Sequence, residues 1–87
     1  MTEIPITVKR VIRFDGDVTL KAYCDVQYGE ILLIGMRVVE GKHGLFVSMP
    51  RQHGKDAKWY DTVRFVEAKE KVRFDNAVLS AYQEIHG

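Results

Sequence analysis

The sequence has a single cysteine, no long hydrophobic run and almost no net charge, and each shortage excludes a class of protein. Cys24 is the only cysteine in 87 residues, so the chain cannot form an internal disulfide, and a reducing compartment suits it. The longest purely aliphatic run, Ile31–Ile34, is far shorter than the run of about 20 residues that a membrane helix needs. The first ten residues lack the apolar segment of a secretion signal. We therefore expect a soluble, cytoplasmic protein with no membrane partner.

Sequence motifs for catalysis and for metal binding are also missing. The three histidines, His43, His53 and His86, are widely spaced, and together with the lone cysteine they form no zinc-type pattern. No nucleophile elbow, phosphate-binding loop or dinucleotide fingerprint occurs. Asp15 and Asp17 flank a turn glycine, where aspartate is expected for turn chemistry alone. We therefore expect a protein that is not an enzyme, with no catalytic residues, no metal, no cofactor and no small-molecule substrate.

Net charge is small, but it is unevenly distributed. The chain carries 13 basic and 12 acidic residues, for a net charge of +1. A protein that neutralises many phosphates is usually more basic than this. Residues 51–73 nevertheless contain seven basic and four acidic side chains, so this segment has a charge of +3 while the rest of the chain has −2. Because binding depends on a local patch, the near-neutral total permits a nucleic-acid surface in this segment.

Alternation of apolar and polar residues predicts strands, and the 46% hydrophobic content is that of one small globular domain spanning residues 1–87. The predicted strands cover residues 6–14, 18–28, 31–40, 45–49 and 59–65. One face of the first strand is predicted to carry Ile6, Val8, Ile12 and Phe14. The aliphatic run at residues 31–34 indicates a central strand that is covered on both faces.

The hydrophobic period changes after Glu67. Apolar residues then recur at helical spacing, and no glycine or proline occurs between Glu67 and His86. Glu67 and Glu70 stand near the start of this segment, where the helix dipole favours anions. Together these patterns predict an α+β fold, namely a five-stranded antiparallel meander sheet with one C-terminal amphipathic helix.

A basic loop is predicted directly after the fourth strand. The sequence VVEGKHGLFVSMP, residues 38–50, indicates a strand, a turn, a second strand and a stop at Pro50, which has no N–H to give to a sheet. The loop that follows, RQHGKDAK, carries Arg51, Lys55 and Lys58. Such a loop is either a solvated turn or a phosphate-binding element on a rigid scaffold.

Two aromatic residues, Trp59 and Tyr60, adjoin the basic loop. Rings beside lysine and arginine could stack on unpaired bases. We favour the other interpretation for Trp59, which is packing in the core or at a subunit contact, because it shares its predicted strand face with Val63 and Phe65.

Three blocks of this sequence, in order, resemble the stage V sporulation protein G family of septation regulators. The opening block contains Ile6, Thr7, Val8 and Arg10. The middle block, which is the most specific, contains Val38, Val39, Glu40, Gly41, Gly44, Leu45, Phe46, Met49 and Pro50. The final block contains Glu70, Lys71, Val72, Ala77, Val78, Leu79 and Tyr82. The family consists of small bacterial proteins that bind DNA and in some cases RNA.

The resemblance implies a homodimer in which strands of two subunits meet, and a sequence-selective DNA-binding regulator of genes for sporulation, septation, cell division or virulence. With the charge pattern, it assigns DNA-phosphate contacts to Arg51, Lys55 and Lys58, with Lys69 or Arg73 at the rim. Two alternatives stay open: an RNA-binding post-transcriptional regulator and a protein-interaction module without nucleic-acid binding. The predicted helix is rich in acidic residues as well as basic ones, which argues against its insertion into the major groove.

Overall fold

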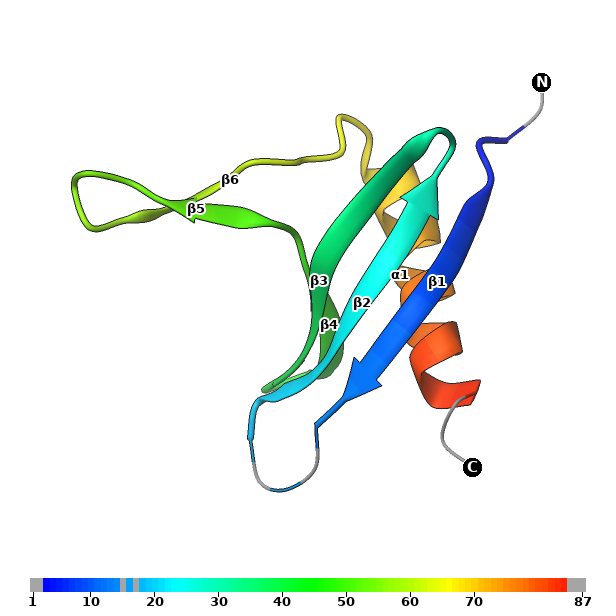
Figure 1. The fold of residues 1–87 in the computed structure, drawn as a ribbon, viewed down its shortest axis with the longest axis horizontal. Helices are drawn as coiled ribbons and strands as arrows, with labels where there is room; N and C mark the ends of the chain where they lie inside the picture. The colour runs from blue at the N-terminus through cyan, green and yellow to red at the C-terminus, as the bar shows by residue number, and fades with distance from the viewer. Residues whose placement is uncertain (1–2, 15, 17, 85–87) are drawn as a thin grey trace.

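The computed structural model describes residues 3–14, 16 and 18–84, and most of the strand residues among them belong to one antiparallel sheet (Figure 1). This sheet has four strands in the order in which they occur along the chain. They are β1 (Ile6–Arg13), β2 (Leu20–Tyr28), β3 (Ile31–Gly41) and β4 (Gly44–Ser48). Helix α1 (Ala68–Glu84) packs on one face of the sheet, so the predicted α+β class and the C-terminal helix are confirmed. Residues 85–87, at the end of the segment with helical periodicity, lie outside the described residues.

The prediction of a five-stranded meander is wrong. The segment predicted as the fifth strand contributes only β6 (Trp59–Asp61), which pairs with β5 (Arg51–His53) in a separate two-stranded sheet. β4 already ends at Ser48, and Pro50 has no N–H with which to continue a ladder. The chain therefore leaves the sheet at Pro50, and the segment expected to be a loop forms a hairpin instead.

The core lies between α1 and the face of the sheet that it covers. Phe74 and Val78 of the helix are fully buried against this face. The sheet contributes the buried residues Ala22, Cys24, Val26, Leu33, Met36, Val38 and Val47. Cys24 is buried here, and burial raises the pKa of its thiol to about 11. The thiol therefore stays protonated near neutral pH and packs as a small apolar group.

Two irregularities in strand pairing change which residues face the helix. In β1 the register shifts between Val8 and Arg10, opposite β2. As a result Ile12 lies opposite Tyr23, which alternates with buried residues of β2 and so faces away from the helix. The prediction that Ile12 and Phe14 share a face with Ile6 and Val8 is therefore wrong. A bulge moves every following side chain to the other face, and strict alternation cannot anticipate it.

Within the described ranges, the face of the sheet opposite α1 is open. Ile34 is 70% exposed, although β3 is an inner strand as predicted. Several large apolar residues besides Ile34 are exposed on this face, and they are Ile12, Phe14, Leu32 and Phe46. The prediction that the aliphatic run is covered on both faces is therefore wrong for the chain by itself, because α1 covers only one face.

Candidate nucleic-acid interface

The predicted basic loop, residues 51–58, forms β5 and the tip of a hairpin that projects from the body of the protein (Figure 1). We call residues 51–61, which contain β5, the tip and β6, the arm. The strands of the arm pack chiefly against each other. At its base, the Thr62 amide donates to the Pro50 carbonyl oxygen over 2.9 Å. The arm thus enters and leaves the body at adjacent points, which we call the neck.

The tip of the arm is a tight turn held by its own backbone. The Gly54 amide donates to the Lys58 carbonyl over 2.8 Å, and the Ala57 amide donates to the Gly54 carbonyl over 3.1 Å. Ala57 has a φ of 64°, in the left-handed region that disfavours side chains. A Cβ at position 54 would come within 2.7 Å of the Tyr60 ring, so any larger residue there would require that ring to shift. The chain therefore turns in one defined conformation between the two lysines.

Two of the three predicted arm cations are available for a ligand. Arg51 pairs with Asp61 through Nε and Oδ1 at 3.1 Å, which partly neutralises both groups. Lys55 and Lys58 are exposed on either side of the turn. The second carboxylate of the arm, Asp56, accepts a hydrogen bond from the Tyr60 hydroxyl, which lowers the pKa of Asp56 and raises that of Tyr60. The carboxylates of the arm are therefore held by their own neighbours.

The arm also carries exposed aromatic rings. Trp59 is 58% exposed and Tyr60 is 51% exposed. Of the two possibilities predicted for Trp59, packing in the core is therefore wrong, because β6 lies in the arm and not in the main sheet, and packing at a subunit contact stays a prediction. The His53 and Trp59 rings lie with their centroids 5.0 Å apart and their planes at 57°. The arm thus combines cations and aromatic surface, which is the composition of many single-strand binding surfaces.

The two predicted helix cations lie elsewhere, on the first turns of α1. Lys69 is exposed, and it lines a shallow depression together with Arg73. Arg73 is held in place by hydrogen bonds to Glu70 Oε2 at 2.7 Å and to the Ile4 carbonyl at 2.6 Å. The hydrogen bonds that Arg73 and Tyr28 donate to Glu70 lower the pKa of this carboxyl to about 2. The depression is also lined by Glu3 and Glu67, a setting that favours cations over phosphate.

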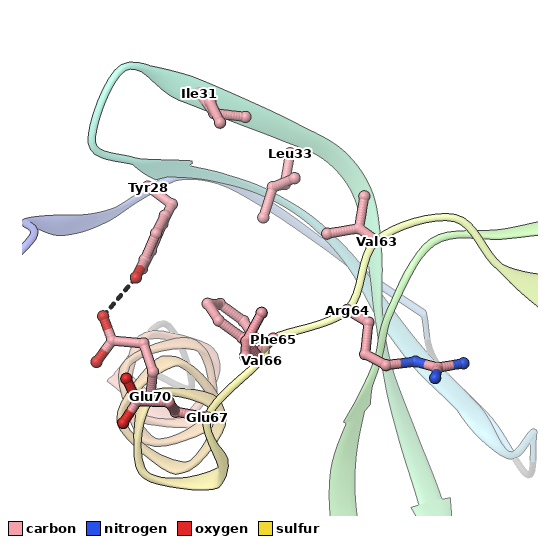
Figure 2. Close-up of a pocket in the computed structure, with 9 residues that line it drawn as sticks. All are labelled: Tyr28, Ile31, Leu33, Val63, Arg64, Phe65, Val66, Glu67 and Glu70. Carbon is pink, nitrogen blue, oxygen red and sulfur yellow. Dashed lines mark hydrogen bonds between the residues drawn. The ribbon is translucent and has the colours of Figure 1, made fainter.

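A mostly apolar pocket of about 390 Å³ lies between the helix start and the turn that joins β2 to β3 (Figure 2). Ile31, Leu33 and Phe65 project into it, and Val63 closes one side. The Tyr28 hydroxyl bonds to Glu70 at its edge (Figure 2). Sequence reasoning missed this pocket, since its walls come from segments that are distant along the chain. Its lining suits an apolar side chain or a small apolar molecule.

Among residues 3–14, 16 and 18–84, no three histidine, cysteine, aspartate or glutamate side chains are grouped as a metal ion would require. Within the same ranges, no helix combines the length and apolar character needed to cross a bilayer.

Comparison with known proteins identifies the family. The SpoVG family model matches residues 1–84. A protein of Archaeoglobus fulgidus named "Putative septation protein SpoVG" is 39% identical over 80 residues, which are 91% of this chain and 94% of that protein. A protein of the same name from Symbiobacterium thermophilum is 40% identical over 88% of this chain, which matches 56% of that longer protein. One from Listeria monocytogenes is 32% identical over 90% of this chain and 78% of its own length. The resemblance read from the three sequence blocks is thereby confirmed, and the chain belongs to the SpoVG family.

Proposed function

We propose that this protein is a DNA-binding regulator of gene expression that acts in the cytoplasm, with a role linked to septation or sporulation. The septation link is suggested by the names of its relatives. The DNA-binding role is supported chiefly by the projecting arm, whose tip exposes Lys55 and Lys58. A narrow hairpin with cations at its end can reach phosphates without burying the body of the protein.

The two lysines at the tip are the main phosphate contacts in this proposal. Lysine and arginine supply most of the sequence-independent affinity for DNA, because each neutralised phosphate releases condensed counterions. Arg51 contributes less than the lysines, since Asp61 already takes part of its charge. Lys69 and Arg73 are weaker candidates for rim contacts than the arm lysines, because Glu3 and Glu67 line the same depression, and Arg73 is also engaged by Glu70.

A homodimer is part of the same proposal. The apolar face of the sheet that α1 leaves open offers a surface for a second copy of the chain. A two-fold dimer would present two arms to one duplex, and their separation would fix the phosphates that they contact. This arrangement would provide site selectivity without a recognition helix.

Salt titration of DNA binding tests the phosphate contacts. We expect the logarithm of the binding constant for a mixed-sequence duplex to fall linearly with the logarithm of the salt concentration. Replacing both tip lysines, Lys55→Ala and Lys58→Ala, should weaken all duplexes about equally and flatten the slope by about one unit per lost contact. Lys9→Ala is the matched control, because Lys9 is exposed on β1, at the edge of the sheet opposite β4.

An unchanged slope and affinity in the double variant would refute the assignment of phosphate contacts to the arm. The variant should fold normally in either case, because removing exposed charges from a turn typically changes stability by less than about 0.5 kcal/mol. Urea denaturation of both variants checks this point.

The pocket favours a second candidate function, a protein-interaction module. Its apolar lining could hold an aliphatic or aromatic side chain of a protein partner, with Glu67 and Glu70 beside it for a basic neighbour. Binding through the pocket would survive about 0.5 M salt far better than phosphate contacts would. Salt at that concentration screens exposed charges but does not weaken apolar contacts. Val63→Glu would place a charge at the wall of the pocket and should abolish such binding, while leaving the arm and its salt slope unchanged.

A further inference from the structure

The strand pairing of the arm sorts its side chains onto two faces. His53 pairs with Trp59, so both rings project from the same face of the hairpin. Arg51 and Asp61 form the pair two residues further along each strand, and their side chains project from this same face. The pair between them, Gln52 and Tyr60, projects from the opposite face. One face of the arm therefore carries an aromatic pair beside an ion pair.

Trp59 is the centre of this aromatic face. Its side chain is 58% exposed, and the imidazole of His53 lies against it at a ring separation of 5.0 Å. A large indole held by a neighbouring ring, and not covered by the body, provides an apolar platform. Tip cations lie close by in sequence, with Lys58 directly before Trp59 and Lys55 across the turn.

The ligand that fits this combination is an unpaired nucleotide. A closed duplex presents only the edges of its bases in the grooves, so its base faces cannot stack on an external ring. A single strand exposes base faces at intervals along a chain of phosphates, which an aromatic ring flanked by cations can recognise. Every base has such a face, so this contact tolerates different sequences.

We infer that the aromatic face of the arm is a stacking site for an unpaired base of single-stranded nucleic acid, with Trp59 as the platform and Lys55 and Lys58 as the adjacent phosphate contacts. The inference rests on the proposed function, because the same lysines hold the backbone. It adds a substrate class: the protein binds a single-stranded or locally melted segment more tightly than the closed duplex of the same sequence.

Trp59 is the only tryptophan of the chain, so its fluorescence reports directly on this site. The probes are oligothymidylate, oligouridylate, a closed duplex, and an abasic oligomer of the same length that keeps its phosphates and lacks bases. Both base-bearing single strands should quench the emission of Trp59, and the abasic oligomer should bind more weakly without quenching it. The ratio of the affinity for oligothymidylate to the affinity for oligouridylate tells whether DNA or RNA is preferred.

Substitution of Trp59 separates stacking from phosphate binding, with fluorescently labelled oligomers as the readout. Trp59→Leu should lower affinity for oligothymidylate by about 5- to 100-fold while leaving the salt slope unchanged. Trp59→Phe should retain most of the affinity, because phenylalanine keeps a stacking face. Val72→Ala is the control, since it removes an exposed apolar side chain from α1, away from the arm and from the open face of the sheet.

Three results would overturn the inference. The first is equal affinity for oligothymidylate and the abasic oligomer. The second is an unchanged affinity of Trp59→Leu for single strands. The third is Trp59 emission that responds to protein concentration but not to nucleic acid, because a second copy of the chain would then cover the ring. If Trp59→Leu has no effect while Lys55→Ala still flattens the salt slope, the stacking inference is refuted but the proposed function stands. If no nucleic acid binds at all, the inference and the proposed function are both refuted.

Discussion

Glu70 holds two distant parts of the chain together at the residue scale. Its carboxylate accepts hydrogen bonds from Tyr28 of β2 and from Arg73 of α1. Arg73 in turn donates to the Ile4 carbonyl, which ties the segment before β1 to the helix. These bonds favour the ionised form of Glu70, and they lower its pKa from 4.5 to about 2.

Acid should therefore remove a stabilising contribution from Glu70. A carboxyl whose pKa is depressed in the folded state stabilises the protein above its unfolded-state pKa, and this contribution is lost as the pH falls through the folded-state value. The free energy of unfolding should thus decline between pH 4.5 and about 2. In Glu70→Gln this decline should be smaller, and the protein should be less stable at pH 7. Urea midpoints measured at a series of pH values provide the test.

Glu84→Gln serves as the control, because Glu84 is exposed on the last turn of α1. It should reproduce the pH dependence of the unchanged protein. Equal acid sensitivity in Glu70→Gln and the unchanged protein would show that the Glu70 bonds contribute nothing to folding.

Individual site residues were only partly predictable from the sequence. The arm lysines could be predicted as exposed, because charged residues between turn glycines and polar neighbours rarely become buried. The exposure of Trp59 could not be predicted, because the alternation of Trp59 with Val63 and Phe65 looks the same in a strand of a hairpin and in a central strand. Which strand pairs with which depends on contacts beyond the local period.

At the scale of elements, irregularities in the strands decide what the helix covers. Gly35 interrupts β3 with a φ of 77°, and its amide donates to Asp25 Oδ1 over 3.2 Å. The interruption allows both Leu33 and Met36 to face α1, although they are three positions apart. The sequence contains the glycine but gives no sign that it forms a bulge here instead of an ordinary turn or a flexible joint.

Gly35→Ala should destabilise the protein by about 1–2 kcal/mol. A Cβ at this position would have open space around it, so the cost comes from the backbone conformation and not from a clash. Thr7→Ala, on the exposed side of β1, is the comparison, and its effect should stay within about 0.5 kcal/mol. Urea denaturation measures both. A Gly35→Ala protein as stable as the Thr7→Ala protein would contradict the proposed role of the positive φ.

The arm should be removable without unfolding the body. The neck residues Pro50 and Thr62 are joined by a 2.9 Å hydrogen bond, so an Asn-Gly turn can replace residues 51–61. We expect the shortened protein to retain its circular dichroism spectrum and to unfold cooperatively in urea, with nucleic-acid binding lost. A shortened chain that fails to fold would show that the arm supports the body.

Sequence periodicity predicted the four strands of the main sheet and the helix, because each has one buried face. It failed for the arm, whose strands of three residues are too short to show a period. Pro50 carried a usable signal, since it ends the sheet, but the pairing of the following segment with itself could not be deduced from that stop.

At the scale of the whole molecule, the open face of the sheet predicts a dimer. Light scattering at micromolar concentration should give about twice the chain mass of 10.0 kDa. Ile34→Lys should shift the protein toward the monomer, because Ile34 is 70% exposed on this face and a lysine there would be desolvated on pairing. The variant should still fold, since the side chain is outside the core.

The control for this experiment is Lys42→Ala, in the exposed turn between β3 and β4. It should leave the mass at that of the dimer. A monomer at all concentrations for the unchanged protein would refute the dimer. A dimer that tolerates Ile34→Lys would move the interface to another surface, with the pocket next to be considered.

The neck has an evolutionary consequence. Because the two ends of the arm meet where Thr62 bonds to Pro50, selection can act on the length and composition of the arm separately from the stability of the sheet. Lengthening a loop of this kind costs only about 0.6 kcal/mol for each doubling, so insertions at the tip are cheap. Descendants of one gene can thereby acquire new targets through a few codons while they inherit an unchanged scaffold.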